Sequence, residues 1–310
     1  MYRDHVIAAV VPAYREERLI ATVITTMPAF VDHIIVVDDA SPDATAQRAR
    51  EVGDARVEVI TLSKNAGVGG AVIAGHKRAM ELGADVNVVM AGDAQMDPDA
   101  LPRLLDPVTT GGYGFAKANR FYSSNSFDGM PRHRLFGNIV LTFLTKSASG
   151  YWNLVDPQNG YTAIRREALD RIPLDRVRQR YEFENDLLIW LNIANIRAVD
   201  VPIPARYGDE HSTIELRHVV PRLIGLMFTG FWRRIFLKYV LWSFSPIALL
   251  LFSGMFLLTV GLGFGVFATV SAVSGETPTA GTVLLAVTPF LCGFFLLVQS
   301  LVLDILATPD

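Results

Sequence analysis

Acidic side chains follow three apolar runs in the first hundred residues. Glu16 comes shortly after the first run, Asp38 and Asp39 end the second, and Asp93 follows the fourth. Carboxylates that gather in one crevice repel each other unless a cation or hydrogen-bond donors lie between them. This pattern therefore indicates a site for a divalent metal ion or a sugar nucleotide.

A glycine-rich segment, Lys-Asn-Ala-Gly-Val-Gly-Gly-Ala at 64–71, follows the third apolar run and opens a helical pattern. Glycines there allow a phosphate to approach the backbone amides at a helix N-terminus. The segment is not a dinucleotide-binding fingerprint, because its glycine spacing differs and it follows the third strand rather than the first. Alone, it is a weak indication of a phosphate site.

The elements that position these residues are four short runs rich in β-branched residues, at 6–12, 33–38, 56–62 and 86–91. Continuous apolarity predicts strands buried on both faces, and the helical patterns between them predict a parallel sheet wound by helices. We therefore expect a Rossmann-like α/β domain that binds its ligand beyond the carboxyl ends of the strands.

The C-terminal part has the composition of a membrane hairpin. No charged residue occurs at 239–275 or at 277–303, and Glu276 alone separates these runs. Each run exceeds the roughly 20 residues that span a bilayer, and the segment 274–281 has the residues of a turn. The cations that precede the first span predict a cytoplasmic N-terminal domain; they are Arg217, Arg222, Arg233, Arg234 and Lys238.

The 310 residues carry 28 basic and 31 acidic side chains, almost all before residue 240. We predict a catalytic domain at 1–216, an amphipathic interfacial segment at 217–242 and two transmembrane helices at 243–306; a simple linker is the alternative for the middle segment. The net charge of −3 and the lack of a basic tract argue against nucleic acid as a partner. The single cysteine, Cys292, excludes an intrachain disulfide.

The strand-end motifs together resemble the family 2 inverting glycosyltransferases, which have the GT-A nucleotide-sugar fold. Val-Val-Pro-Ala-Tyr-Arg-Glu-Glu at 10–17 and Val-Val-Asp-Asp-Ala-Ser-Pro-Asp-Ala-Thr at 36–45 carry the resemblance, which extends over residues 6 to about 215. The branch is that of dolichol-phosphate mannose synthase and the polyprenyl-phosphate glycosyltransferases. The resemblance implies that the nucleotide donor is bound by Pro12, Tyr14, Glu16, Asp39, Gly67, Gly69, Asp93, Gln95 and Arg120.

The metal motif of this family is Asp-x-Asp followed two residues later by Gln. The chain has Ala91-Gly92-Asp93-Ala94-Gln95, so Asp93 and Gln95 match and Ala91 replaces the first Asp. The resemblance implies Mg²⁺ or Mn²⁺ at Asp93 and Gln95. With one carboxylate fewer, we expect weaker metal binding in the absence of the nucleotide.

The resemblance also implies an acceptor site. Lys-Ala-Asn-Arg-Phe at 117–121 and Asp-Pro-Gln-Asn-Gly-Tyr at 156–161 resemble family segments near the acceptor, and Thr213 stands where the family has a lysine. The implied catalytic residues are Asp156, Asp93 and Arg134. The implied acceptor-phosphate contacts are Arg120, Arg134, Asn138, Arg206, His211 and Ser212. The plainer alternatives are surface ion pairs for Arg120 and Arg134 and a turn at Asp156.

The implied activity is transfer of a sugar from GDP-mannose, UDP-glucose or another UDP-hexose to dolichyl or undecaprenyl phosphate. A membrane and a second copy of the chain are the other implied partners. Two alternatives stay open: a hydroxyl acceptor, for which Asp156 is the base, and a non-catalytic membrane scaffold, suggested by Ala91 and Thr213. A processive polysaccharide synthase is disfavoured, because the chain lacks Gln-x-x-Arg-Trp and further spans.

Overall fold

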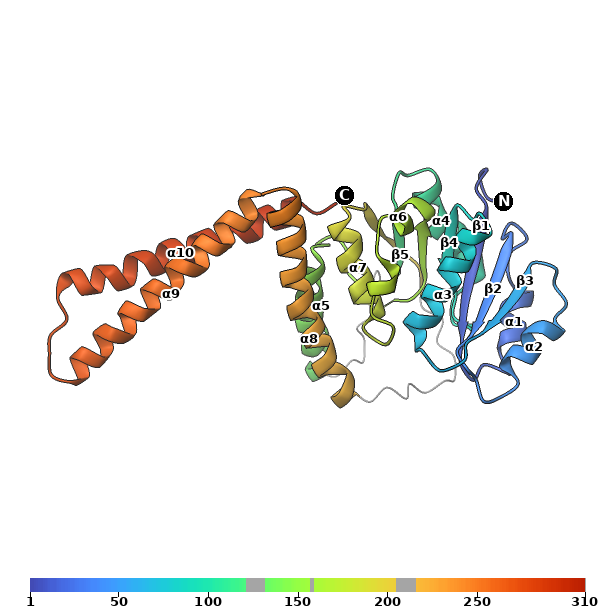
Figure 1. Cartoon of the computed structure of the whole chain (residues 1–310), viewed down its shortest axis with the longest axis horizontal. Helices are drawn as coiled ribbons and strands as arrows, with labels where there is room; N and C mark the ends of the chain where they lie inside the picture. The colour runs from blue at the N-terminus through green and yellow to red at the C-terminus, as the bar shows by residue number, and fades with distance from the viewer. Residues whose placement is uncertain (121–131, 157–158, 205–215, 310) are drawn as a thin grey trace. The chain divides into compact units, whose positions relative to one another are not determined.

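The computed structural model describes residues 1–120, 132–156, 159–204 and 216–309 (Figure 1). The chain divides into two compact units. The first comprises Met1–Phe231 with Pro309–Asp310, and the second comprises Trp232–Thr308. The helix α8 (Leu216–Arg234) contains the boundary between them.

The first unit contains a sheet in the order β3-β2-β1-β4-β6-β5-β7. Neighbouring strands are parallel except where β6 pairs with β4 and β5. The strands are β1 (Ile7–Ala13), β2 (His33–Asp38), β3 (Val57–Thr61), β4 (Val86–Val89), β5 (Phe115–Asn119), β6 (Thr162–Arg165) and β7 (Ala198–Pro202). The four strands predicted from apolar runs and the mainly parallel α/β sheet are confirmed.

The strand order reverses beside β1. The chain passes from β1 to β2 and β3 on one side and then returns to place β4 on the other side. Loops that leave neighbouring strands in opposite directions open a crevice at the carboxyl ends of those strands. The fold therefore places its crevice at the ends of β1 and β4, where Tyr14 and Asp93 lie.

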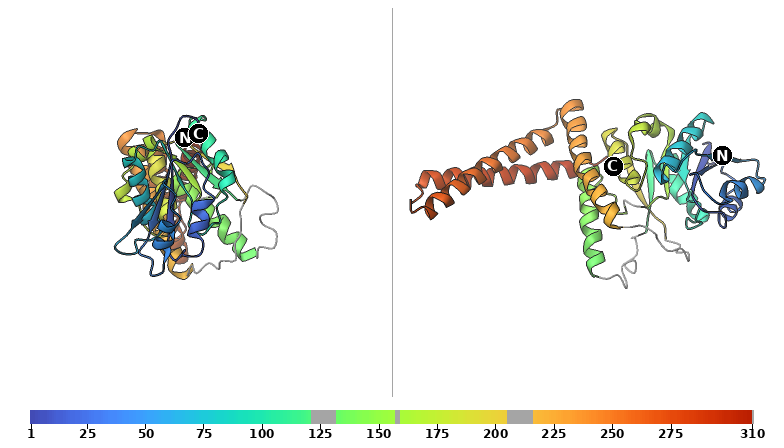
Figure 2. Two further views of the ribbon diagram at one scale, coloured as in Figure 1. Left: turned by 90° about the vertical axis from the view of Figure 1, so that its right-hand side faces the viewer. Right: turned by 60° about the horizontal axis from the view of Figure 1, so that its bottom comes forward.

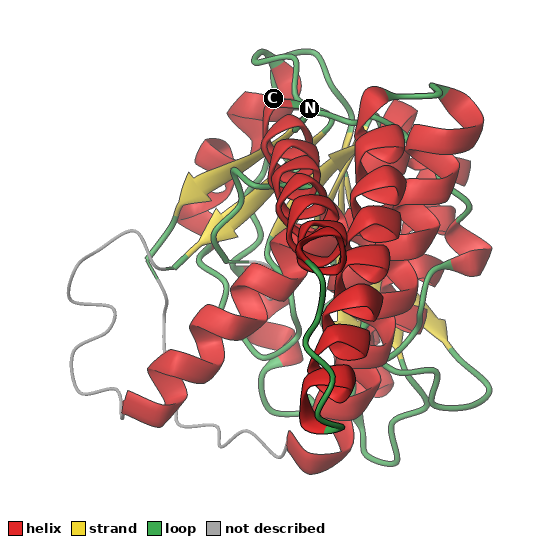
Figure 3. Ribbon diagram, turned by 90° about the vertical axis from the view of Figure 1, so that its left-hand side faces the viewer, coloured by secondary structure: helices red, strands yellow, loops and turns green. Residues whose placement is uncertain are grey.

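Helices cover both faces of the sheet, as the red helices and yellow strands of Figure 3 show. Ile7, Ala9 and Val11 of β1 face the core under α1, α2 and α4, whereas Ala8 faces α3. The helices of this unit are α1 (Ile20–Thr25), α2 (Thr45–Glu51), α3 (Val68–Glu81), α4 (Leu101–Thr109), α5 (Arg132–Ser149), α6 (Arg166–Asp170) and α7 (Phe183–Ile193), with short 3₁₀ turns at Pro98–Ala100 and Leu174–Arg176.

Glycines let α3 lie close to its neighbours. A Cβ atom on Gly75 would come within 2.2 Å of Val10 Cγ1, and one on Gly69 would come within 2.5 Å of Phe183 Cβ. Neither distance is possible without movement of β1 or α7. Gly69, one of the glycines that suggested a phosphate site, is thus also required for helix packing.

His76, on α3, is fully buried, and its Nδ1 atom lies 3.3 Å from Asn87 Nδ2. Burial lowers the pKa of His76 from 6.5 to about 4. Between these values the unfolded chain binds a proton that the folded chain excludes, so the protein loses stability as the pH falls through this window.

We predict that the free energy of unfolding of the first unit falls by up to about 3 kcal/mol between pH 6.5 and 4 because of His76. The His76→Leu variant, which cannot take up this proton, is expected to show a flatter dependence. Denaturant unfolding followed by circular dichroism at a series of pH values measures both slopes. Equal slopes would contradict the prediction.

The second unit contains two long apolar helices, α9 (Pro246–Val273) and α10 (Ala280–Leu306), which run side by side (Figure 1; Figure 2, right). Each is long and apolar enough to span a membrane. A Cβ atom on Gly261 would lie 2.6 Å from Phe290 N, and one on Gly293 would lie 2.6 Å from Leu258 N. Small residues therefore set the close approach of the two helices.

A buried ion pair ties this hairpin to the segment before it. Arg234 donates to both carboxylate oxygens of Asp304, at 2.6 and 3.0 Å, and Tyr239 donates to Asp304 at 2.7 Å. Tyr239 belongs to a π-helical segment, Ile235–Trp242. The predicted interfacial segment 217–242 thus corresponds to α8 and this π-helical segment, and its place at a membrane surface stays a prediction.

Candidate active site

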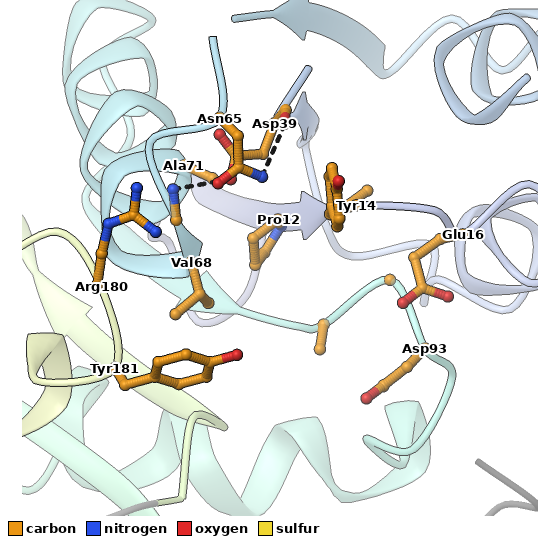
Figure 4. Close-up of a pocket in the computed structure, with 14 residues that line it drawn as sticks. Pro12, Tyr14, Glu16, Asp39, Asn65, Val68, Ala71, Asp93, Arg180 and Tyr181 are labelled. Atoms are coloured by element: carbon orange, nitrogen blue, oxygen red, sulfur yellow. Dashed lines mark hydrogen bonds between the residues drawn. The ribbon is translucent and has the colours of Figure 1, made fainter. Parts of the chain in front are cut away.

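A cavity of about 350 Å³ opens at the carboxyl ends of β1, β2 and β4 (Figure 4). Six residues predicted to bind the donor line it: Pro12, Tyr14, Glu16, Asp39, Gly67 and Asp93. They come from the ends of four strands, β1 to β4, that are far apart in the sequence. The expectation that the strand-end carboxylates gather in one crevice is confirmed for Glu16, Asp39 and Asp93.

Asp39 supports the wall of this cavity. Its side chain is 3% exposed, and its two oxygens accept hydrogen bonds from the backbone N–H groups of Ala66, at 2.6 Å, and Gly67, at 2.9 Å. Asn65 Nδ2 donates to the Asp39 carbonyl at 3.3 Å (Figure 4). The charge of Asp39 therefore holds the turn that starts α3, where Gly67 has a φ of +85°. Its predicted contact with the nucleoside stays a prediction.

The loops after β1 and β2 are tied to each other. Arg15 N donates to Ser41 Oγ at 3.1 Å, and Glu16 N donates to Thr45 Oγ1 at 2.9 Å. Arg15 and Ala40 have positive φ angles of 64° and 55°. Non-glycine residues rarely adopt this conformation, and its recurrence at strand ends beside a cavity is typical of a functional site.

Asp93 is held in its loop by a backbone amide and lines the same cavity as Glu16. Its Oδ1 accepts from Gln95 N at 3.0 Å, and Asp93 and Glu16 lie on the same side of the cavity in Figure 4. In the described part of the chain, no three His, Cys, Asp or Glu side chains are grouped so that they could hold a metal ion. The residues thus fit a cation whose coordination is completed by diphosphate oxygens and water.

Two lining residues, Arg180 and Tyr181, had no donor-binding role in the sequence-based prediction. Gly70 N donates to Gln179 O at 2.9 Å, which attaches the segment before α7 to the first turn of α3. In Figure 4, Arg180 lies opposite Glu16 and Asp93, beside the Asn65 turn. The local sequence offers little signal, because Arg176 and Arg178 precede Arg180 at the same spacing and do not line the cavity.

Arg120 and Asp156 form an ion pair instead of lining the nucleotide cavity. Arg120 Nε and Nη2 donate to the two oxygens of Asp156, at 2.8 and 3.1 Å. The Asp156 side chain is 2% exposed and that of Arg120 is 36% exposed. A carboxylate held by two such bonds is well placed to orient a neighbouring group and poorly placed to take a proton.

The remaining predicted residues have other positions. Gly69 lies against Phe183, as described above, and Gln95 follows Asp93 in the same loop. Arg134 and Asn138 belong to α5, and their side chains are not described. Arg206, His211 and Ser212 lie outside the described residues. The acceptor contacts proposed for these residues stay predictions.

A second cavity, of about 200 Å³, shares Pro12, Val68 and Ala91 with the first. Lys117 and Glu184 line it. Burial lowers the pKa of Lys117 to about 8, an effect opposed by the carboxylates of Glu184, Asp156 and Asp200. Burial also raises the pKa of Glu184, against the opposing charge of Lys117.

Comparison with known proteins gives the family of this molecule. The model described as "Glycosyl transferase family 2" matches residues 8–173, which include β1 to β6 and every strand end that lines the cavity. The chain belongs to glycosyl transferase family 2. This confirms the resemblance on which the sequence-based enzyme prediction depended.

Two relatives have names that refer to polyprenyl or dolichyl phosphates. The UDP-N-acetylglucosamine–dolichyl-phosphate N-acetylglucosaminyltransferase of Methanococcus voltae is 31% identical over 66% of this chain and 88% of its own length. The polyprenol monophosphomannose synthase of Mycolicibacterium smegmatis is 36% identical over 55% of this chain and 65% of its own length.

A solved structure of glucosyl-3-phosphoglycerate synthase from Mycobacterium tuberculosis, in complex with Mn²⁺, uridine-diphosphate-glucose and phosphoglyceric acid, has the same fold. The TM-score is 0.54 and the identity is 23%, over 74% of this chain and 80% of the other. The GT-A fold expected from the strand-end motifs is confirmed.

We predict that Arg180 serves the nucleoside end of the donor, because it lies opposite Asp93. The Arg180→Ala variant is expected to lower the affinity for a nucleoside monophosphate and for the diphosphate alike, on the order of tenfold. Asp93→Asn is expected to lower the affinity for the diphosphate more than the affinity for the monophosphate. Calorimetric titration with both nucleotides in the presence of Mg²⁺ measures this.

The matched control is Arg178→Ala, which removes an exposed arginine two residues away and should leave both affinities unchanged. Selective loss of the diphosphate in Arg180→Ala would place Arg180 at the other end of the nucleotide.

Proposed function

We propose that this protein transfers a hexosyl group from a nucleoside diphosphate sugar to the phosphate of a polyprenyl lipid, with inversion at the anomeric carbon. The observation that carries the proposal is the convergence of Pro12, Glu16 and Asp93 on one cavity in a family 2 chain that also has two membrane-length helices. Its relatives from Methanococcus voltae and Mycolicibacterium smegmatis, named for dolichyl phosphate and polyprenol products, support the lipid acceptor.

On the donor side, Tyr14, Arg180 and Tyr181 surround the nucleoside, and the diphosphate lies toward Asp93. Asp93 and Gln95 would hold Mg²⁺ or Mn²⁺, and such an ion would supply positive charge to stabilise the departing diphosphate. The bond from the anomeric carbon to the diphosphate oxygen breaks as the bond to the lipid phosphate oxygen forms. The diphosphate leaves with the electron pair of the broken bond.

On the acceptor side, no general base is needed. A phosphate monoester has a second pKa near 6, so most of it is a dianion at pH 7. Arg120, held by Asp156, directs its charge toward this anion together with Arg134, Asn138, Arg206, His211 and Ser212. The bidentate ion pair of Asp156 argues against the alternative of a hydroxyl acceptor, which requires that carboxylate as a base.

The membrane provides the acceptor. In this proposal the hairpin of α9 and α10 anchors the protein, and the cations that precede it support a cytoplasmic N-terminal domain. A long-chain lipid phosphate has its tail in the bilayer and its charged group at the surface, so anchoring the enzyme there raises the concentration of its substrate.

We expect the purified full-length protein to transfer radiolabelled sugar from a nucleotide donor to a short polyprenyl phosphate in detergent. The test is a panel of GDP-mannose, UDP-glucose and UDP-N-acetylglucosamine, each with and without EDTA. Chelation should stop transfer and excess Mg²⁺ or Mn²⁺ should restore it, because diphosphate departure needs the cation. Absence of transfer from every donor would support the scaffold alternative.

For Asp156→Asn, the orienting role predicts a raised KM for the lipid and a fall in kcat of less than about tenfold. Loss of a required base lowers kcat by roughly 10²- to 10⁴-fold. Steady-state kinetics with both substrates varied distinguish the orienting role from the role of a base. The matched control is Asp170→Asn, at an exposed position. A 100-fold fall in kcat with unchanged donor and lipid affinity would refute the orienting role.

A further inference from the structure

The second cavity adjoins the first cavity. Pro12, Val68 and Ala91 line both spaces. Ala91 stands where the family motif has an aspartate, so its methyl group leaves room that a carboxylate would fill. Any group attached to the diphosphate near Asp93 has this space directly beside it.

The walls of this cavity are mainly apolar, with one charged region. Lys117 comes from β5, where it is 1% exposed, and Glu184 comes from the first turn of α7. Thr162 lies opposite Lys117 in the β5–β6 register. Apolar side chains form the rest of the lining, namely Val72, Val89, Met96, Phe115, Phe183 and Leu187.

Lys117 is fully buried and Glu184 is half-buried. Taking such charges out of water costs up to several kcal/mol per ion, and apolar residues in their place often give equal stability. The same two groups present donors and acceptors to a ligand that enters the cavity, because an ammonium has three N–H donors and a carboxylate accepts several hydrogen bonds. The volume, about 200 Å³, is below the roughly 300–1,000 Å³ of sites for drug-sized ligands. It suits a single sugar ring.

We propose that this second cavity receives the sugar of the donor and selects a 2-acetamido sugar over a plain hexose through Lys117, Glu184 and the apolar wall beside Met96. This inference rests on the proposed function. The acetamido carbonyl accepts from the Lys117 ammonium, and the acetamido N–H donates to Glu184. The acetamido methyl group packs against Met96 and Leu187. A hydroxyl at the same carbon cannot make this apolar contact.

The sharpest test is Gly160→Ala, which adds one methyl group to the cavity wall. The new Cβ atom would lie 3.5 Å from Met96 Cε and 4.0 Å from Glu184 Oε1, which are ordinary contacts, so the fold is expected to tolerate it. Calorimetric titration of the full chain in detergent, with Mg²⁺, compares UDP, UDP-glucose and UDP-N-acetylglucosamine.

The wild-type protein is expected to bind UDP-N-acetylglucosamine about tenfold more tightly than UDP-glucose. Gly160→Ala should lower the affinity for UDP-N-acetylglucosamine by a similar factor and leave the affinity for UDP unchanged. The matched control is Gly225→Ala in α8, where a Cβ atom would meet nothing within 4 Å, and it should change none of the three affinities.

A second variant removes the charges of both Lys117 and Glu184. Lys117→Met combined with Glu184→Gln should abolish the preference for the acetamido sugar while UDP still binds. The inference is overturned if the wild-type protein does not distinguish the two sugars, or if both variants retain the wild-type preference. Transfer of any sugar to polyprenyl phosphate would then still support the proposed function, whereas failure of that transfer with every donor refutes the function itself.

Discussion

The hydrogen bonds that Asp39 accepts are the interaction on which the rest of the site depends. This buried carboxylate at the end of β2 holds the backbone of Ala66 and Gly67, each through a bond to a charged acceptor, which is worth about 1.5–3 kcal/mol. The turn it holds starts α3, and the first turn of α3 in turn binds Gln179 O. One anion therefore helps to set where the Gly67 turn, α3 and Arg180 lie around the first cavity.

The same arrangement divides the acidic residues by role. Asp39 and Asp156 are almost fully buried, and their oxygens are bound by backbone amides and by Arg120, respectively. Glu16 and Asp93 lie together on the cavity wall. Under the proposed function, a diphosphate bound in this cavity would face the charges of Glu16 and Asp93 but not the neutralised charge of Asp156, and a cation at Asp93 would offset that repulsion.

In the second unit, a charged pair is kept within an apolar hairpin. Arg234 is fully buried and both of its contacts to Asp304 are short, with Tyr239 as a third partner. Loss of one partner from such a pair costs about 3–5 kcal/mol, because the other charge stays buried. The pair therefore holds the end of α10 against the segment that begins the unit, while glycines bring α9 and α10 together along their length.

The sequence by itself determined the first four strands, the hairpin and six of the residues that line the cavity, because strand periodicity, composition and strand-end motifs are local along the chain. It did not reveal the Asp39–Gly67 bonds, Arg180, the pairing of Asp304 with Arg234, or the cavity of Lys117 and Glu184. Each of these joins residues that are between 28 and 70 positions apart or lie on different elements. Only the tertiary structure decided them, because partner choice for a buried charge depends on which groups packing brings within hydrogen-bond distance, and no local pattern records that.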